Sequence, residues 1–136
     1  MIPRKEYMNF LIQLKDKQII KVISGVRRCG KSTLFEMYRD YLLENGVKEE
    51  QIVSINFEDV EYENLTNYRV LYDEIKKQLI SNKMNYIFLD EIQHVEKFEK
   101  AVDSLFIKKN IDLYITGSNA YLLSGELATL LSRKIC

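Results

Sequence analysis

Hydrophobic positions recur along the chain with two different periods. In four segments they lie three and four residues apart, which predicts amphipathic helices near residues 7–14, 31–44, 68–79 and 98–106. Short runs rich in β-branched and aromatic residues predict strands at 19–24, 52–57, 86–90 and 111–116. Residues 122–131 predict one more helix, with a break near Ser124 and Gly125.

Helices and strands therefore alternate, which predicts an α/β fold with a parallel sheet. Residues 86–89 are continuously apolar, as expected of a strand buried on both faces. Ligands of such sheets bind at the carboxyl ends of the strands. The functional residues are therefore expected where the strands end.

The amino-acid composition excludes several classes of protein. The chain has 136 residues, 46% of them hydrophobic, which suits one domain with one core. Its 20 basic and 20 acidic residues balance, which gives no reason to expect a bulk binder of nucleic acid or anionic membrane. Two cysteines make neither a disulfide scaffold nor a zinc cluster. Without an 18-residue apolar window or a signal-peptide pattern, we expect a cytoplasmic protein and no membrane partner.

Charge is unevenly distributed in one place. Residues 49–67 contain six acidic residues and no lysine or arginine. We interpret this segment as a solvated acidic loop away from any phosphate site. A surface for a partner or a metal is the alternative.

Residues 25–32 match the pattern G-x-x-x-x-G-K-[ST], between a predicted strand and a predicted helix. Glycines let the backbone wrap tightly, so that its N–H groups and the helix N-terminus cradle phosphate oxygens. Lys31 is expected to reach the β- and γ-phosphates, Ser32 to ligate Mg²⁺ and Thr33 to donate to the α-phosphate. The predicted nucleotide-binding residues are Gly25, Val26, Arg27, Arg28, Cys29, Gly30, Lys31, Ser32 and Thr33. The side chains of Arg27 and Arg28 are expected either in solvent or against a partner subunit or domain.

The apolar run 86–89 ends in the acidic pair Asp90 and Glu91. After a phosphate loop, this pattern predicts that Asp90 holds Mg²⁺ indirectly, through another ligand or a water molecule, and that Glu91 polarises the attacking water as general base. His94, the single histidine, is expected at the surface or at a helix start.

The strand at 111–116 is followed by Gly117, Ser118 and Asn119. A small polar residue here either contacts the γ-phosphate and the attacking water or caps a helix. Ser118 and Asn119 are the candidates for this contact, and Thr116 is less favoured.

Three blocks of the chain, 23–33, 88–93 and 115–119, resemble the uncharacterised bacterial and archaeal ATPases of the AAA+ superfamily. The resemblance includes the Arg-Arg pair of the Walker A motif and the Asp-Glu-Ile-Gln run of the Walker B motif. It implies a P-loop sheet in the order 5-1-4-3-2. Strand 4 then lies between the two Walker strands, which favours Ser118 and Asn119 as residues beside the γ-phosphate.

The resemblance also implies that this chain is only part of an ATPase of this group. We expect residues 1–136 to be the N-terminal portion of an ATPase domain, truncated before strand 5 and before a further C-terminal domain. Strand 1 would then lie at a sheet edge. Arg133 corresponds to an expected arginine only in part, because no glycine precedes it.

The expected function is Mg²⁺-dependent ATP binding and, in the complete domain, ATP hydrolysis, with Lys31, Glu91, Ser118 and Asn119 as catalytic residues. Binding is expected to be more efficient than turnover in this chain. A nucleotide-dependent regulatory or scaffold switch is the alternative, and a small-molecule kinase a weaker one. The expected partners are nucleotide and either the missing C-terminal domain or other subunits. No basic, aromatic-rich segment indicates nucleic-acid binding.

Overall fold

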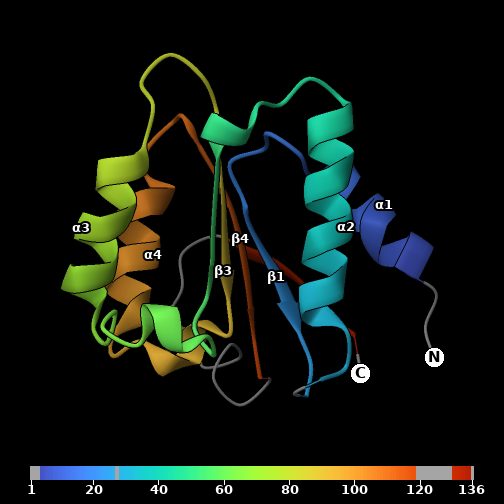
Figure 1. Cartoon of the computed structure of the whole chain (residues 1–136). Coiled ribbons are helices and arrows are strands. Elements are labelled where there is room, and N and C mark those ends of the chain that lie inside the picture. Colours follow the sequence, from blue (N-terminus) through green and yellow to red (C-terminus); the bar gives the residue numbers. More distant parts are fainter. Residues whose placement is uncertain (1–3, 27, 119–129, 136) are drawn as a thin grey trace.

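The computed structural model describes residues 4–26, 28–118 and 130–135 (Figure 1). Helices and strands alternate as the hydrophobic pattern predicts. Their bounds are α1 Arg4–Gln13, β1 Ile20–Ser24, α2 Lys31–Glu44, β2 Ile52–Asn56, α3 Tyr68–Gln78, β3 Asn85–Asp90, α4 Phe98–Phe106, β4 Ile111–Gly117 and β5 Leu130–Lys134. Short 3₁₀ turns lie at Glu49–Gln51, Val60–Tyr62 and Ile92–His94.

The strands form one parallel sheet in the order β2-β3-β4-β1-β5. This confirms the predicted α/β class and the order 1-4-3-2, with β4 between the two strands that precede the candidate motifs. Each crossover carries the chain over one face of the sheet, so the carboxyl ends of β1, β3 and β4 meet at one edge.

The expectation of a missing fifth strand is wrong. β5 pairs with β1 from Ile20 opposite Leu130 to Ser24 opposite Lys134, and the N–H of Ile135 donates to the Ser24 carbonyl at 2.7 Å. β1 is therefore an interior strand. Leu130 and Leu131 belong to β5 and not to the helix predicted at 122–131, because β1 offers unpaired backbone groups that a short apolar run can satisfy. The rest of that predicted helix lies outside the described residues.

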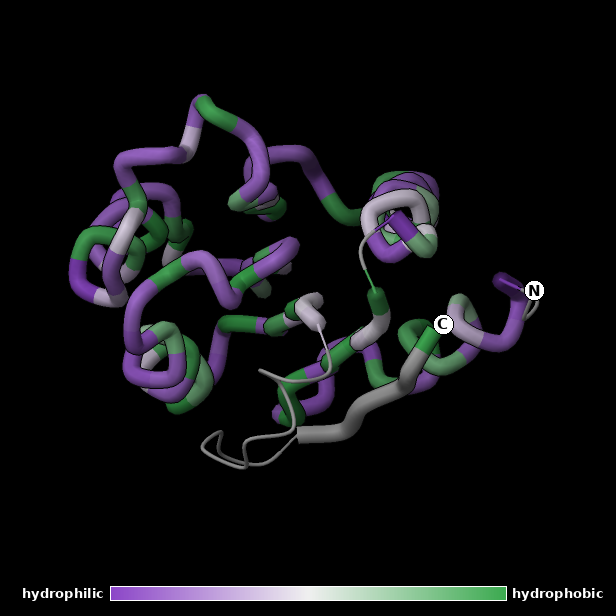
Figure 2. Tube along the Cα trace, turned by 90° about the horizontal axis from the view of Figure 1, so that it is seen from below, coloured by the Kyte–Doolittle hydropathy of each residue, from purple (hydrophilic) through white to green (hydrophobic). Residues whose placement is uncertain are grey.

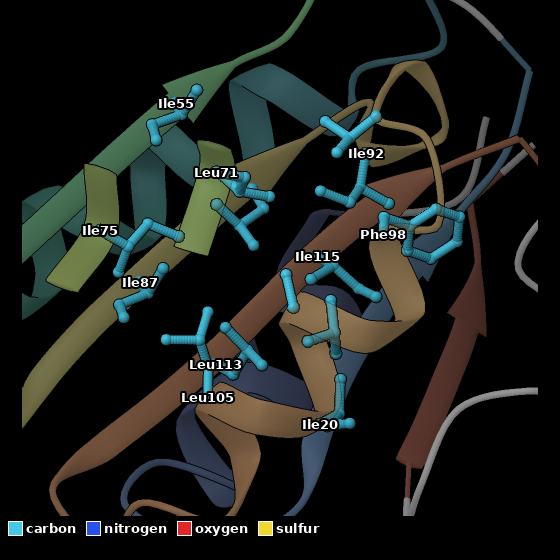
Figure 3. Packing of buried hydrophobic residues seen from close by; sticks show 14 of the residues in the cluster. Ile20, Ile55, Leu71, Ile75, Ile87, Ile92, Phe98, Leu105, Leu113 and Ile115 are labelled. Carbon is cyan, nitrogen blue, oxygen red and sulfur yellow. The ribbon is translucent and has the colours of Figure 1, made fainter. Parts of the chain in front are cut away.

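Helices cover both faces of the sheet. Ile87 and Leu89 of β3 point into the core beneath α3 and α4, whereas Tyr86 and Phe88 point toward α1 and α2. Figure 3 shows the first of these cores, with Leu71 and Ile75 of α3 facing the strands. Seen from below, the strands run between the two pairs of helices (Figure 2). No helix in the described parts of the chain is long and apolar enough to cross a membrane.

A buried ion pair lies under α1 and α2. Lys21 of β1 donates to Asp112 of β4, and both side chains are fully buried. The Asp16 N–H and the Tyr114 hydroxyl donate to the other Asp112 oxygen at 2.8 and 2.7 Å. Burial raises the pKa of Asp112 and lowers that of Lys21, while their attraction opposes both shifts.

Candidate functional site

The segment between β1 and α2 passes over the carboxyl edge of the sheet, at the lower edge of the sheet in Figure 1. The Gly25 N–H donates to the Gly117 carbonyl at 3.3 Å, which ties the start of the loop to β4. Gly30 has a φ of 104°, a conformation that residues with a Cβ rarely adopt, and its carbonyl accepts the Leu34 N–H at 3.0 Å. The second glycine of the motif is therefore required where the loop turns into the first turn of α2.

A cavity of about 530 Å³ lies against this loop. Its size falls within the range of small-ligand sites, roughly 300–1,000 Å³. Six predicted loop residues line it, namely Arg28, Cys29, Gly30, Lys31, Ser32 and Thr33. Gly25 and Val26 do not line it, and Val26 is exposed; Arg27 lies outside the described residues.

Lys31 is the first residue of α2, and its side chain turns back over the loop. It is 2% exposed, and its Nζ donates to the Gly25 carbonyl. The same ammonium lies 3.0 Å from Glu91 Oε2. The lysine of the loop and the second carboxylate of the acidic pair are therefore brought together in one place.

Asp90 ends β3 beside the loop. It accepts hydrogen bonds from the hydroxyls of Ser32 and Thr116, one on each carboxylate oxygen. Burial raises the pKa of Asp90, and these two hydrogen bonds act in the opposite direction.

The pairing of Ser32 with Asp90 fits a magnesium site. Mg²⁺ prefers oxygen ligands and usually takes one or two from protein, completing its shell with water and substrate phosphates. A hydroxyl and a carboxylate in contact provide such a pair. Within residues 4–26, 28–118 and 130–135 no group of three or more histidine, cysteine or acidic side chains forms a closed metal cage.

Glu91 is held by three contacts. Its backbone is left-handed, with φ 61°, and its N–H donates to Thr116 Oγ1 at 2.9 Å. Gln93 Nε2 donates to Glu91 Oε1 at 2.7 Å, and Lys31 occupies Oε2. Non-glycine residues in this conformation concentrate at functional sites, where surrounding contacts hold them.

The sequence patterns did not predict two of these contacts, those of Thr116 and Gln93. Thr116, the least favoured candidate after β4, is fully buried and bridges Asp90 and Glu91. Gln93 was noted only as part of the acidic motif. Ser118 directly follows β4, is half-buried and does not line the cavity, while Asn119 lies outside the described residues. A γ-phosphate contact by Ser118 or Asn119 stays a prediction.

Glu58 corrects the interpretation of the acidic segment. It follows β2 and lines the cavity, so part of that segment lies at the phosphate loop and not away from it. β2 pairs with β3 in parallel, with Asn56 opposite Asp90, so the residues after both strands meet at one edge. His94 is half-exposed, as expected, with Nε2 4.0 Å from Glu58 Oε2.

A family model described as an AAA domain, AAA_14, matches residues 17–136. The chain belongs to this AAA domain family. The match includes the loop and both strands that end at it, and it places the chain in the AAA+ superfamily that the motifs resemble. Membership implies nucleotide binding.

Two curated relatives of this AAA domain are uncharacterized proteins. One, from Haemophilus influenzae, is 50% identical over 133 residues, which is 97% of this chain and 33% of the relative. The other, MJ1544 of Methanocaldococcus jannaschii, is 39% identical over 118 residues, covering 82% of this chain and 24% of the relative. The chain thus spans about a third or less of the length of these relatives.

Solved structures share the fold of this AAA domain. A DNA polymerase III gamma subunit-related protein from Thermotoga maritima matches with a TM-score of 0.68 at 13% identity, over 95% of this chain and 45% of that one. A chain in the structure of Drosophila ORC bound to AT-rich DNA and Cdc6 matches with a TM-score of 0.59 at 13% identity, over 96% and 52%. At this identity the likeness shows the fold alone.

Proposed function

We propose that this AAA domain binds Mg·ATP at the loop between β1 and α2 and hydrolyses it with Glu91 as the water-activating base. The observation that carries the proposal is the meeting of Lys31 and Ser32, at the start of α2, with Asp90 and Glu91, at the end of β3. Lys31, Ser32 and Glu91 line the cavity. Family membership, with its implied nucleotide binding, supports it.

Binding rests on the loop and on Lys31. The N–H groups of the loop and of the first turn of α2 give a partial positive charge, which favours phosphate. Lys31 is poised to exchange its contact with Glu91 for the β- and γ-phosphates. Ser32 and Asp90 would hold Mg²⁺, which supplies charge neutralisation between the phosphate oxygens when bound.

Hydrolysis rests on Glu91. A carboxylate oxygen accepts a proton from water as the water oxygen bonds to the γ-phosphorus, and the bond from that phosphorus to the bridging oxygen breaks. ADP leaves with the bridging oxygen and phosphate with the new one. Gln93 and the Thr116 hydroxyl keep the Glu91 carboxylate and backbone in place.

A nucleotide-dependent switch with slow turnover is the second candidate. It is favoured by the same geometry, because both Glu91 oxygens already have partners within the protein. Such a switch would act on the rest of a longer protein or on other subunits in the cytoplasm. A small-molecule kinase is disfavoured, because the phosphoryl acceptor would make Glu91 unnecessary as a water activator.

Steady-state release of phosphate from Mg·ATP separates these functions. Glu91→Gln is expected to lower turnover at least about a hundredfold while Mg·ATP still binds, because general-base catalysis contributes about 10²–10⁴-fold. Glu61→Gln, an exposed acidic residue outside the cavity lining, serves as the control. Equal turnover in Glu91→Gln and wild type would contradict the assigned role. Binding without turnover in the wild type would favour the switch.

A further inference from the structure

One wall of the cavity comes from outside both motifs. Arg4, in the first turn of α1, lines the cavity, and its Nη1 donates to the Gly30 carbonyl at 3.3 Å. A Cβ built at Gly30 would lie 3.0 Å from Arg4 Nη2. The guanidinium therefore lies directly against the phosphate loop, although 26 residues separate the two positions.

The position of Arg4 is fixed by the buried side of α1. Tyr7, Phe10 and Leu11 pack in the same core as Leu34 and Tyr38 of α2. The Tyr38 hydroxyl also donates to the Leu11 carbonyl at 3.4 Å. Since α2 starts in the loop, this packing sets the distance between the first turn of α1 and Gly30.

The charges that line the cavity favour a second role for Arg4, which is to supply positive charge to the ligand. Among the described residues that line it, three carry positive side chains, Arg4, Arg28 and Lys31, and two carry carboxylates, Glu58 and Glu91. Lys31 already faces Glu91, so Arg4 and Arg28 provide the remaining positive charge. Removing Arg4 would leave as many carboxylates as cations around a polyanionic ligand. A guanidinium has five N–H donors, more than the Gly30 contact uses, and its planar shape suits phosphate oxygens.

We propose that Arg4 is a nucleotide-binding residue that contacts the phosphates of the ligand while bracing the loop through Gly30. The proposal rests on the proposed function and extends the nucleotide site to α1, which neither motif includes. The contact is charge-assisted, and such contacts between arginine and phosphate are among the strong ones in proteins.

Calorimetric titration with Mg·ADP tests this without interference from turnover. Arg4→Ala is expected to raise the Kd at least about tenfold, and Arg4→Lys by less, because the charge remains but the planar fork is lost. Lys5→Ala is the matched control, since Lys5 is an exposed cation one residue away on the same helix. Its Kd should stay within about twofold of wild type.

Salt dependence separates a phosphate contact from a purely structural brace. If Arg4 contacts phosphate, the Kd of Arg4→Ala should rise less steeply with NaCl than that of wild type, because one screened charge pair is gone. A lowered melting temperature with an unchanged salt slope would overturn the phosphate contact and leave only the brace. Equal Kd values for Arg4→Ala and Lys5→Ala would overturn the inference alone. Failure of wild type and Lys5→Ala to bind Mg·ADP would instead overturn the proposed function.

Discussion

Lys31 Nζ lies 3.0 Å from Glu91 Oε2, so the phosphate-binding ammonium of the loop and the candidate base form a buried ion pair. Both side chains are almost fully buried, at 2% and 4% exposure, where solvent screens the attraction little. Nucleotide phosphates must therefore compete with Glu91 for Lys31. When they succeed, one Glu91 oxygen becomes available to water while Gln93 still holds the other.

This competition predicts that Glu91→Gln binds Mg·ADP more tightly than wild type. The neutral amide removes the attraction that the phosphates must overcome, and a gain of about tenfold corresponds to about 1.4 kcal/mol. Mg·ADP is used because slower hydrolysis cannot then trap the ligand. Glu61→Gln should leave the Kd unchanged. Weaker binding by Glu91→Gln would show that the ion pair organises the site and does not compete with the ligand.

The Thr116 hydroxyl connects Asp90 to the Glu91 backbone, which makes Thr116→Val a sensitive variant. Valine keeps the shape but leaves a buried carboxylate oxygen and a buried N–H without this partner. We expect the free energy of unfolding to fall by about 1–3 kcal/mol in urea denaturation. Thr116→Ser keeps the hydroxyl and should recover most of the loss. A Thr116→Val variant as stable as wild type would show that the bridge contributes nothing.

Gly30 and Gly46 form a matched pair for testing the loop. Both have left-handed backbones, with φ of 104° and 96°, so alanine at either position should cost about 1–2 kcal/mol of stability. A Cβ at Gly46 meets nothing within 4 Å, whereas one at Gly30 lies 3.0 Å from Arg4 Nη2. Gly30→Ala should therefore weaken Mg·ADP binding and Gly46→Ala should not. Equal effects of both variants on the Kd would contradict the placement of the nucleotide beside Gly30.

The buried pair of Lys21 and Asp112 predicts a pH-dependent loss of stability in Lys21→Met. Removing one partner of a buried ion pair costs about 3–5 kcal/mol. Burial already raises the pKa of Asp112 above its unfolded value, and loss of Lys21 removes an interaction that lowers it. A group with a raised folded pKa contributes stability at low pH and loses it as pH rises through that pKa. Lys21→Met should therefore be destabilised more at pH 8 than at pH 4.

Urea denaturation at several pH values measures this difference in the free energy of unfolding. Lys5→Met is the control variant, because Lys5 is exposed. Lys21→Met combined with Asp112→Leu should recover part of the stability, because no uncompensated charge remains buried. A loss in Lys21→Met that is the same at pH 4 and pH 8 would contradict the role assigned to Asp112.

The sequence predicts those parts of the fold that depend on local periodicity. β1 to β4 lie within a residue or two of their predicted positions, because apolar runs between amphipathic helices leave few alternatives. β5 was missed, since its pairing with Ile20–Ser24 depends on an edge that exists only in the folded sheet.

In the candidate site, too, some residues follow from local sequence patterns and others only from the folded structure. Gly30, Lys31, Ser32, Asp90 and Glu91 follow fixed spacings that the chemistry of phosphate binding requires. Arg4 and Glu58 reach the cavity through helix packing and strand pairing, which no local spacing records. Thr116 is the least favoured of the three candidates from the sequence, because no local pattern records that its side chain contacts both Asp90 and Glu91 in the folded sheet.

The central claim is that the loop from Gly25 to Ser32 binds nucleotide through Lys31. Calorimetric titration of Mg·ATP into wild type and Lys31→Ala tests it most directly, with thermal melting to establish that the variant folds. We expect the wild type to bind one equivalent and Lys31→Ala to bind at least about tenfold more weakly, because a charge-assisted contact to phosphate is lost. No binding by the wild type, or equal affinity in a folded Lys31→Ala variant, would contradict the account.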